Sequence, residues 1–268
     1  MSYSRFRSKP YEPGQRTPFR ISRSKIELFM QCPRCFWLDV RYKISRPSGP
    51  PFNINKAIDE LFKKEFDYFR AKGEPHPLMT ETGINAVPFR HKNMDKWRQA
   101  LGKDAGVDVI HESTNLHIFG AVDDVWVDDN GNLIVVDYKA TAKAEPVKSL
   151  GAEGTWHDTY RRQMEIYQWL LRQNDFKVSD TGYFVYATGS WDHDKFDNVV
   201  NFETHVFPHK GKSDWVDKTI KKMKKTMDSE TMPPVGKNIM NPTKPCEFCD
   251  YAKSRTEFTL KHLKNSGK

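Results

Sequence analysis

The feature that most constrains this fold is a pair of β-rich runs separated by an Asn-Gly dipeptide at positions 130 and 131. The runs Leu116–Val127 and Leu133–Ala140 are rich in β-branched and apolar residues. Asn-Gly between two such runs is a strong signal for a β-hairpin, so both runs are predicted to be paired strands. Asp137 and Lys139 lie two residues apart and are expected to point to the same face of the second strand.

The turn decides which acidic residue of the first strand faces Asp137. A three-residue loop with Gly131 in the left-handed conformation sets Asp123 opposite Asp137, whereas a two-residue loop sets Asp124 there. The first register is favoured because a carboxylate in an apolar stripe needs a partner, such as a metal ion or Lys139. The stripe that Asp123 would share consists of Phe119, Ala121 and Val125. Two such carboxylates beside an ammonium predict a Mg²⁺ or Mn²⁺ site for cutting phosphodiesters, to which the carbonyl of Tyr138 could add a ligand.

The four cysteines form two C-x-x-C pairs at opposite ends of the chain. They are Cys32, Cys35, Cys246 and Cys249, with no cysteine between the pairs. In a cytosolic protein this pattern indicates a four-thiolate metal site rather than disulfides. We therefore expect the C-terminal segment to be joined to the N-terminal helical region through a metal, which would contribute to folding.

Helical and strand patterns alternate along the chain, which predicts the α/β class. Helices are expected at about residues 22–39, 55–70, 95–101, 158–173 and 215–227, with further strands at 181–188 and 199–207. At 268 residues with 37% hydrophobic content, the chain is expected to form one domain over residues 21–268. The polar and basic residues 1–20 are predicted to be a flexible arm.

Charge and hydropathy exclude some classes of protein. The net charge of +8 permits binding to a polyanion, although charge alone is weak support. The sequence has no apolar stretch of membrane-spanning length and no signal peptide at its start, so we expect a cytoplasmic protein that does not insert into a membrane. A Ser, His or Cys nucleophile mechanism has little support because no nucleophile-elbow motif is present.

Three segments together resemble the PD-(D/E)XK nuclease superfamily, specifically its RecB-like branch, which includes the CRISPR-associated exonucleases. The segments are Gly120–Asp123, Val135–Lys139 and Gln163–Tyr167, and the resemblance runs from about Ser22 to about Tyr251. It implies a restriction-endonuclease-like core, with a central mixed β-sheet flanked by helices. It also implies a metal-dependent deoxyribonuclease, expected to be an exonuclease in DNA repair, recombination or CRISPR-related processing. The implied substrate is DNA, as single strands or duplex ends; the resemblance names no protein partner.

The chain departs from this family at two places. Relatives carry G-x-x-x-H on an early helix, where this sequence has Asn55 and Asp59. Asp59 is the favoured replacement for the histidine, with Glu65 as its rival. Relatives with a [4Fe–4S] cluster have one N-terminal and three C-terminal cysteines, but no cysteine lies near Arg255. Cys35 could supply the fourth thiolate; the flanking segments favour the cluster, and Zn²⁺ is the alternative.

The resemblance also assigns roles to individual side chains. Asp123, Asp137 and Asp59 would hold or brace the metal ion, and Lys139 would stay protonated and stabilise developing charge. Gln163 and Tyr167, four residues apart on one helix face, would contact a nucleic-acid strand or brace the carboxylates. Two alternatives remain: a nucleic-acid-binding protein with a degenerate nuclease site, and a scaffold with a structural metal site.

Overall fold

The computed structural model describes residues 9–49 and 52–266. Contacts among the described residues group into two compact units. Unit 1 combines residues 9–48 with residues 110–117 and 217–266, and unit 2 contains residues 49, 52–109 and 118–216. Within the described residues, no helix is both long and apolar enough to cross a membrane.

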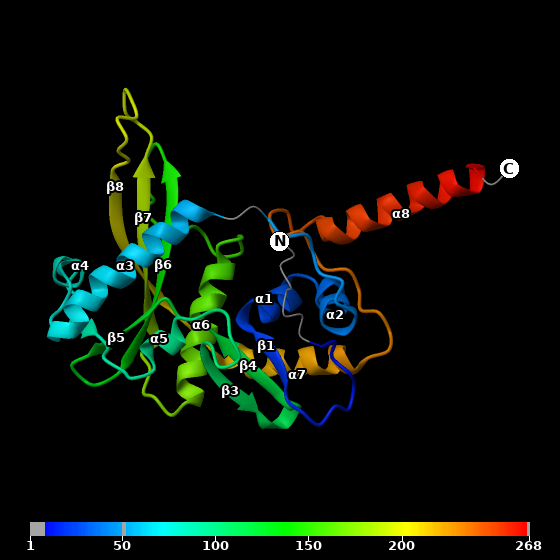
Figure 1. Cartoon of the computed structure of the whole chain (residues 1–268), viewed down its shortest axis with the longest axis horizontal. Helices are drawn as coiled ribbons and strands as arrows, with labels where there is room; N and C mark the ends of the chain where they lie inside the picture. Colours follow the sequence, from blue (N-terminus) through cyan, green and yellow to red (C-terminus); the bar gives the residue numbers. More distant parts are fainter. Residues whose placement is uncertain (1–8, 50–51, 267–268) are drawn as a thin grey trace, which may run out of the picture. The chain divides into compact units, whose positions relative to one another are not determined.

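Unit 2 is built on a five-stranded mixed sheet with the strand order β2-β5-β6-β7-β8 (Figure 1). The strands are β2 (Ala86–Pro88), β5 (Asp124–Asp128), β6 (Leu133–Lys143), β7 (Thr181–Ser190) and β8 (Phe202–Lys210). Only β6 and β7 pair in parallel, and the other neighbours are antiparallel. The parallel pair needs a crossover, which is helix α6 (Asp158–Gln173). This arrangement confirms the predicted α/β class with a mixed sheet.

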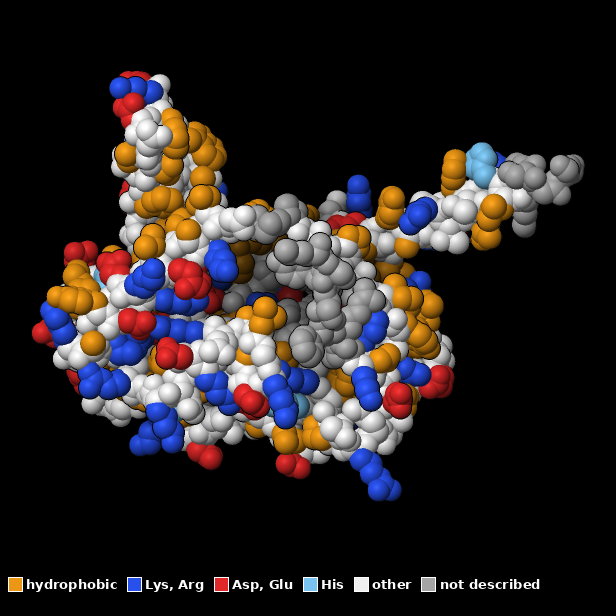
Figure 2. Space-filling model, in the orientation of Figure 1, with side chains coloured by type: hydrophobic (Ala, Val, Ile, Leu, Met, Phe, Trp, Pro, Cys, Tyr) orange, Lys and Arg blue, Asp and Glu red, His pale blue; other side chains and the backbone are white. Residues whose placement is uncertain are grey.

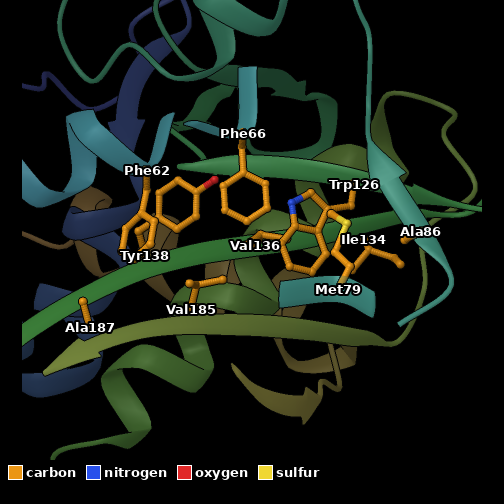
Figure 3. Packing of buried hydrophobic residues seen from close by; sticks show 10 residues of the cluster. All are labelled: Phe62, Phe66, Met79, Ala86, Trp126, Ile134, Val136, Tyr138, Val185 and Ala187. Carbon is orange, nitrogen blue, oxygen red and sulfur yellow. The ribbon is translucent and has the colours of Figure 1, made fainter. Parts of the chain in front are cut away.

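Helix α3 (Asn53–Lys72) covers one face of this sheet. Its buried Phe62 and Phe66 side chains meet Tyr138 and Trp126, with ring centroids 5.0 Å apart for Phe62–Tyr138 and 5.4 Å apart for Phe66–Trp126 (Figure 3). Successive strand residues point to opposite faces, so Asp137, next to Tyr138, points away from this core. The alternation therefore separates an aromatic core from a polar face on the same strand.

The predicted strand Leu116–Val127 is two strands in the structure. β4 (Leu116–Gly120) belongs to a three-stranded sheet with the order β1-β4-β3, and β5 starts only at Asp124. The chain changes sheets at residues 121–123, so the prediction of one continuous strand was wrong. Strand propensity could not reveal this, because β-branched residues suit either sheet.

Unit 1 carries the two ends of the described chain. Its first helical region is broken into α1 (Arg23–Gln31) and α2 (Pro33–Tyr42), because Pro33 lacks an N–H and starts a new helix. Tyr11, which falls in the predicted flexible arm, is 3% exposed and donates from its hydroxyl to Asp228 at 2.6 Å. Residues 1–8 of that arm lie outside the described residues.

The remaining elements are shorter or lie near the chain ends. They are β1 (Phe19–Ser22), α4 (Pro77–Glu81), α5 (Met94–Trp97), β3 (Val107–His111), the 3₁₀ helix η1 (Glu112–Thr114), α7 (Asp214–Asp228) and α8 (Glu247–Ser266). The end of β7, the start of β8 and the segment between them project from the surface and carry orange, apolar side chains below a charged tip (Figure 2). Trp191, just after β7, and Phe202, at the start of β8, are both exposed.

Candidate active site and candidate metal centre

The β5–β6 hairpin adopts the register that the sequence predicted. Asp124 pairs with Val136 and Val127 with Leu133, so the residue before β5, Asp123, lies opposite Asp137. Gly131 closes the turn with φ of 77°, the left-handed conformation required of a three-residue loop. The reason given for this register was partly wrong, because Phe119 belongs to β4 in the other sheet.

Asp137 is completely buried and held by two side chains. Gln163 on α6 donates from Nε2 to Asp137 Oδ1 at 2.6 Å, and Lys139 forms an ion pair with Asp137 Oδ2. Burial acts to lower the pKa of Lys139, but the charges of Asp137 and Asp123 outweigh it and raise that pKa. The Lys139 ammonium is therefore protonated at neutral pH, as the role assigned to it requires.

Asp123 faces the same group of charges. Its Oδ2 accepts a hydrogen bond from the backbone N–H of Tyr138 at 2.9 Å. Burial, followed by repulsion from Asp137, raises the pKa of Asp123 to about 7, while Lys139 opposes that rise. A bound cation would offset the repulsion between the two carboxylates and so favour the ionised form of Asp123.

Asp59 on α3 lies at the edge of this group. It lines a cavity of about 110 Å³ together with Asn55, Tyr138, Lys139 and Tyr160. Lys63 donates to Asp59 Oδ2 at 2.6 Å, whereas Asp59 Oδ1 is buried without a hydrogen-bond partner. Burial, and next the charge of Asp123, raise the pKa of Asp59. An unpartnered buried oxygen close to the Asp123 carboxylate fits a hard divalent ion, which prefers oxygen ligands.

The rival residue Glu65 is directed elsewhere. Its side chain is 56% exposed, and its Oε1 lies 2.9 Å from Nε2 of His76. Of the two residues weighed on this helix, only Asp59 lies near the hairpin carboxylates. Among the described residues, the four cysteines are the only group of three or more potential ligands whose ligand atoms all lie within 4.8 Å of one another, so the three aspartates do not form such a group. Mg²⁺ is commonly held by one or two carboxylates plus water and substrate phosphate, so the pair Asp123 and Asp137 could hold such an ion without a third carboxylate.

Gln163 and Tyr167 take the bracing position rather than an exposed one. Gln163 also donates to the Tyr167 hydroxyl at 3.2 Å, and Tyr167 is 3% exposed. The Tyr167 ring therefore has almost no surface with which to contact a nucleic acid. Tyr160, on the same helix, faces the site: the Lys139 Nζ lies 4.7 Å from its ring centroid.

Sequence reasoning missed a buried charge network beneath the hairpin. Asp124 is completely buried, and its Oδ1 accepts from Arg70 and, at 2.9 Å, from Arg98. Its Oδ2 accepts from the Tyr138 hydroxyl at 2.7 Å. The network fixes Asp124 and Tyr138, which directly follow Asp123 and Asp137 in the chain. It therefore helps to hold the backbone that carries the two candidate-site carboxylates. The consecutive pair Asp123-Asp124 was the one available signal, since alternation sends two adjacent carboxylates to opposite faces.

The four cysteines meet in unit 1. The Sγ–Sγ distances are 3.7 Å for Cys32–Cys249, 3.7 Å for Cys35–Cys246 and 3.5 Å for Cys35–Cys249. The first three cysteines in chain order are buried, and none forms a disulfide. The predicted joining of the two C-x-x-C pairs is confirmed, and four thiolates are a set of ligands for a soft or borderline metal.

Comparison with known proteins points to one family. A model of the PD-(D/E)XK nuclease superfamily matches residues 54–254, a stretch that contains every residue of the acidic site and the second cysteine pair. Solved structures also match, among them one described as the crystal structure of SSO0001, with a TM-score of 0.35. It is 14% identical, over 76% of this chain and 74% of that one. No curated protein matches the chain.

Proposed function

Because the chain belongs to the PD-(D/E)XK nuclease superfamily, we propose that it is a metal-dependent deoxyribonuclease that hydrolyses phosphodiester bonds. The proposed substrate is DNA, as single strands or as the ends of duplexes, and the proposed mode is exonucleolytic. Processing of DNA ends in repair, recombination or CRISPR-related reactions is the cellular setting that fits such an activity.

The observation that carries this proposal is the convergence of charge at the start of β5 and on β6. Asp123 and Asp137 lie opposite each other, and Lys139 forms an ion pair with Asp137. The pKa of Asp123 rises to about 7, first through burial and then through the nearby Asp137 charge. Carboxyl groups whose pKa is raised by burial and by a neighbouring charge are typical of sites that bind a cation and act on a substrate.

The chain supports hydrolysis by holding groups in place. Asp123 and Asp137 would bind Mg²⁺ or Mn²⁺, with the Tyr138 carbonyl as a further proposed ligand and Asp59 bracing the site. The ion, when bound, supplies Lewis-acid stabilisation of phosphoryl charge and a more acidic water. The Lys139 ammonium orients the attacking water and stabilises charge that develops on the phosphoryl oxygens. The P–O bond to the leaving oxygen breaks as the water oxygen bonds to phosphorus, and the leaving oxygen takes up a proton.

Gln163 supports this site as a positioning residue. Its Nε2 donates to Asp137 and to the Tyr167 hydroxyl, so the amide connects the buried tyrosine to the carboxylate. A hydrogen bond at 2.6 Å to Oδ1 of the fully buried Asp137, opposite the oxygen that pairs with Lys139, fixes the orientation of this carboxylate. We propose that Gln163 and Tyr167 act through Asp137, and that DNA contacts come from other residues of the site's rim.

The test is a cleavage assay with four substrates: end-labelled single-stranded DNA, end-labelled blunt duplex DNA, end-labelled RNA, and circular DNA that carries its label internally. Each is incubated with Mg²⁺, with Mn²⁺ or with a chelator. We expect metal-dependent release of short products from linear DNA, none from circular DNA, and no cleavage by Asp137→Asn. Glu65→Gln is the matched control, because it removes an exposed carboxylate from the same unit and should keep full activity.

The alternative classes give different outcomes in the same assay. Tight DNA binding with no metal-dependent product from any substrate would identify a binding protein with a degenerate site. If the protein neither binds nor cleaves DNA, the result would favour the alternative of a scaffold with a structural metal site. Cleavage that Asp137→Asn retains would overturn the assignment of the acidic site.

A further inference from the structure

The family resemblance implies a [4Fe–4S] cluster at the four cysteines, and the sulfur positions allow a direct test of the fit. Three of the four Sγ–Sγ distances between cysteines of different C-x-x-C pairs are 3.5 to 3.7 Å. All four sulfurs lie within 4.8 Å of one another. The four residues belong to unit 1, so the cluster is defined within one compact part of the chain.

Two kinds of metal centre require different sulfur separations. A single tetrahedral Zn²⁺ with Zn–S bonds near 2.3 Å places its sulfurs about 3.8 Å apart. In a [4Fe–4S] cluster each thiolate binds a different iron at a different corner of a cube, so the cysteine sulfurs lie about 6 Å apart. The observed separations match one ion and leave no room between the thiolates for four irons and four sulfides.

We propose that the four cysteines bind one tetrahedral Zn²⁺ ion that is structural, instead of the iron–sulfur cluster. All four positions of the ion would be filled by protein thiolates, so the site is closed, as structural zinc sites are. The C-x-x-C spacing also belongs to such sites. The ion would join residues more than two hundred positions apart and complete the fold of unit 1.

The surroundings of the sulfurs are built to hold thiolates at these positions. Cys32 Sγ accepts backbone N–H groups from Cys35 at 3.4 Å and from Gly236 at 3.2 Å. Each C-x-x-C pair begins a helix, α2 or α8, whose N-terminal dipole favours negative charge. These N–H groups and dipoles stabilise the charged form of the ligands, which is the form that binds zinc.

The backbone also encloses the cysteines tightly. A Cβ atom placed on Gly236 would come within 2.1 Å of the Gln31 carbonyl oxygen and 2.4 Å of the Cys32 Cα. Only glycine therefore fits beside Cys32 at this position, and its N–H reaches the Cys32 sulfur at 3.2 Å.

The Arg46 guanidinium places a positive charge at the edge of the cysteine site. Its Nη2 donates to Cys246 Sγ at 3.3 Å, and its guanidinium lies 4.6 Å from the Phe248 ring centroid. Four thiolates around a divalent ion carry a net charge of −2, so a neighbouring guanidinium offsets part of the excess negative charge. Arg46 is thus a positioning residue for the zinc site and would tune its affinity.

The first test is the metal content of the full chain, prepared once in air and once anaerobically, from cells supplied with both iron and zinc. We expect about one zinc per chain in both preparations, and little iron or acid-labile sulfide. The protein should show none of the visible absorption that an iron–sulfur cluster gives. Replacement by Co²⁺ should give the intense visible bands of a tetrahedral thiolate site. Iron and sulfide at about four each per chain in the anaerobic sample would overturn the proposal, as would the absence of both metals.

Variants test the ligands without relying on nuclease activity. Cys249→Ser should lower zinc affinity by more than about 100-fold in competition with a chelator, and Arg46→Ala by roughly 10-fold, because outer groups orient and balance the ligands. Ser254→Ala, an exposed change on α8, is the matched control and should leave affinity unchanged. If Cys249→Ser does not fold, the Co²⁺ spectrum of the unmodified chain still decides the number and geometry of thiolates. Unchanged affinity in both Cys249→Ser and Arg46→Ala would refute the site.

Discussion

The raised pKa of Asp123 makes metal binding at the acidic site dependent on pH. With a pKa of about 7, set first by burial and then by Asp137, the carboxyl group must lose its proton before it can bind a cation. Its ionised fraction is about one tenth at pH 6 and about nine tenths at pH 8. The apparent affinity for Mn²⁺ should therefore rise about tenfold between these pH values, which corresponds to ~1.4 kcal/mol.

The effect on the stability of the metal-free protein has the opposite direction. Because the folded-state pKa of Asp123 is raised above its ordinary value of 3.8, protonation stabilises the fold at low pH. This contribution is complete below 3.8 and is lost as the pH rises towards about 7. Mn²⁺ should thus raise the melting temperature more at pH 8 than at pH 6.

The assay is titration of the metal-free protein with Mn²⁺, followed by electron paramagnetic resonance of the free ion at pH 6, 7 and 8. Asp123→Asn removes the titrating group, so it should bind more weakly and lose most of the pH dependence. Glu65→Gln should keep the wild-type profile, since its exposed carboxylate pairs with His76. A change of less than about twofold across this range in the wild-type protein, or a tenfold change that persists in Asp123→Asn, would refute the reasoning.

Three further predictions concern catalysis and stability. Lys139→Met should slow single-turnover cleavage by about 10²–10³-fold, because the ammonium acts on charge that develops during the reaction. DNA affinity, measured by fluorescence anisotropy, should change little. Equal losses of cleavage rate and DNA affinity would contradict a role for Lys139 in the chemical step alone. Asp124→Asn should lower the free energy of unfolding in urea by ~3 kcal/mol, because the buried Arg70 and Arg98 lose their buried carboxylate and keep only the partly exposed Asp67 as ionic partner; a loss below about 1 kcal/mol would mean that the Asp124 charge is dispensable. Phe66→Ala should cost ~3–5 kcal/mol in the same measurement, since its side chain is fully buried, whereas Leu61→Ala on the exposed side of α3 should cost little.

Local chemistry made part of the site predictable. The hairpin register followed from the Asn-Gly turn, because only a few loop lengths fit two antiparallel strands and Gly131 takes the positive φ without strain. The helix expected at residues 158–173 is α6, whose apolar period is regular. With the register and α6 in place, the positions of Asp137, Lys139 and Gln163 follow from alternation and helical spacing.

Contacts between distant segments were not predictable in the same way. Sequence spacing could not separate Asp59 from Glu65, since both lie beside the apolar stripe of α3 and only the tertiary structure sends Glu65 to His76. The burial of Tyr11 depends on Asp228, more than two hundred residues later. The charge network around Asp124 needs two arginines from separate segments, and no local pattern links them.

The sequence by itself determined the α/β class, the hairpin with its aspartates and lysine, and the joining of two C-x-x-C pairs, since these depend on residue type and short-range geometry. The tertiary structure alone decided which of Asp59 and Glu65 lies near the hairpin carboxylates, which oxygen of Asp59 stays unpartnered, and how far apart the four sulfurs lie. The physical reason is that distances between remote side chains result from the packing of whole elements. A thiol or a carboxylate is specified by the sequence, but the space around it is not.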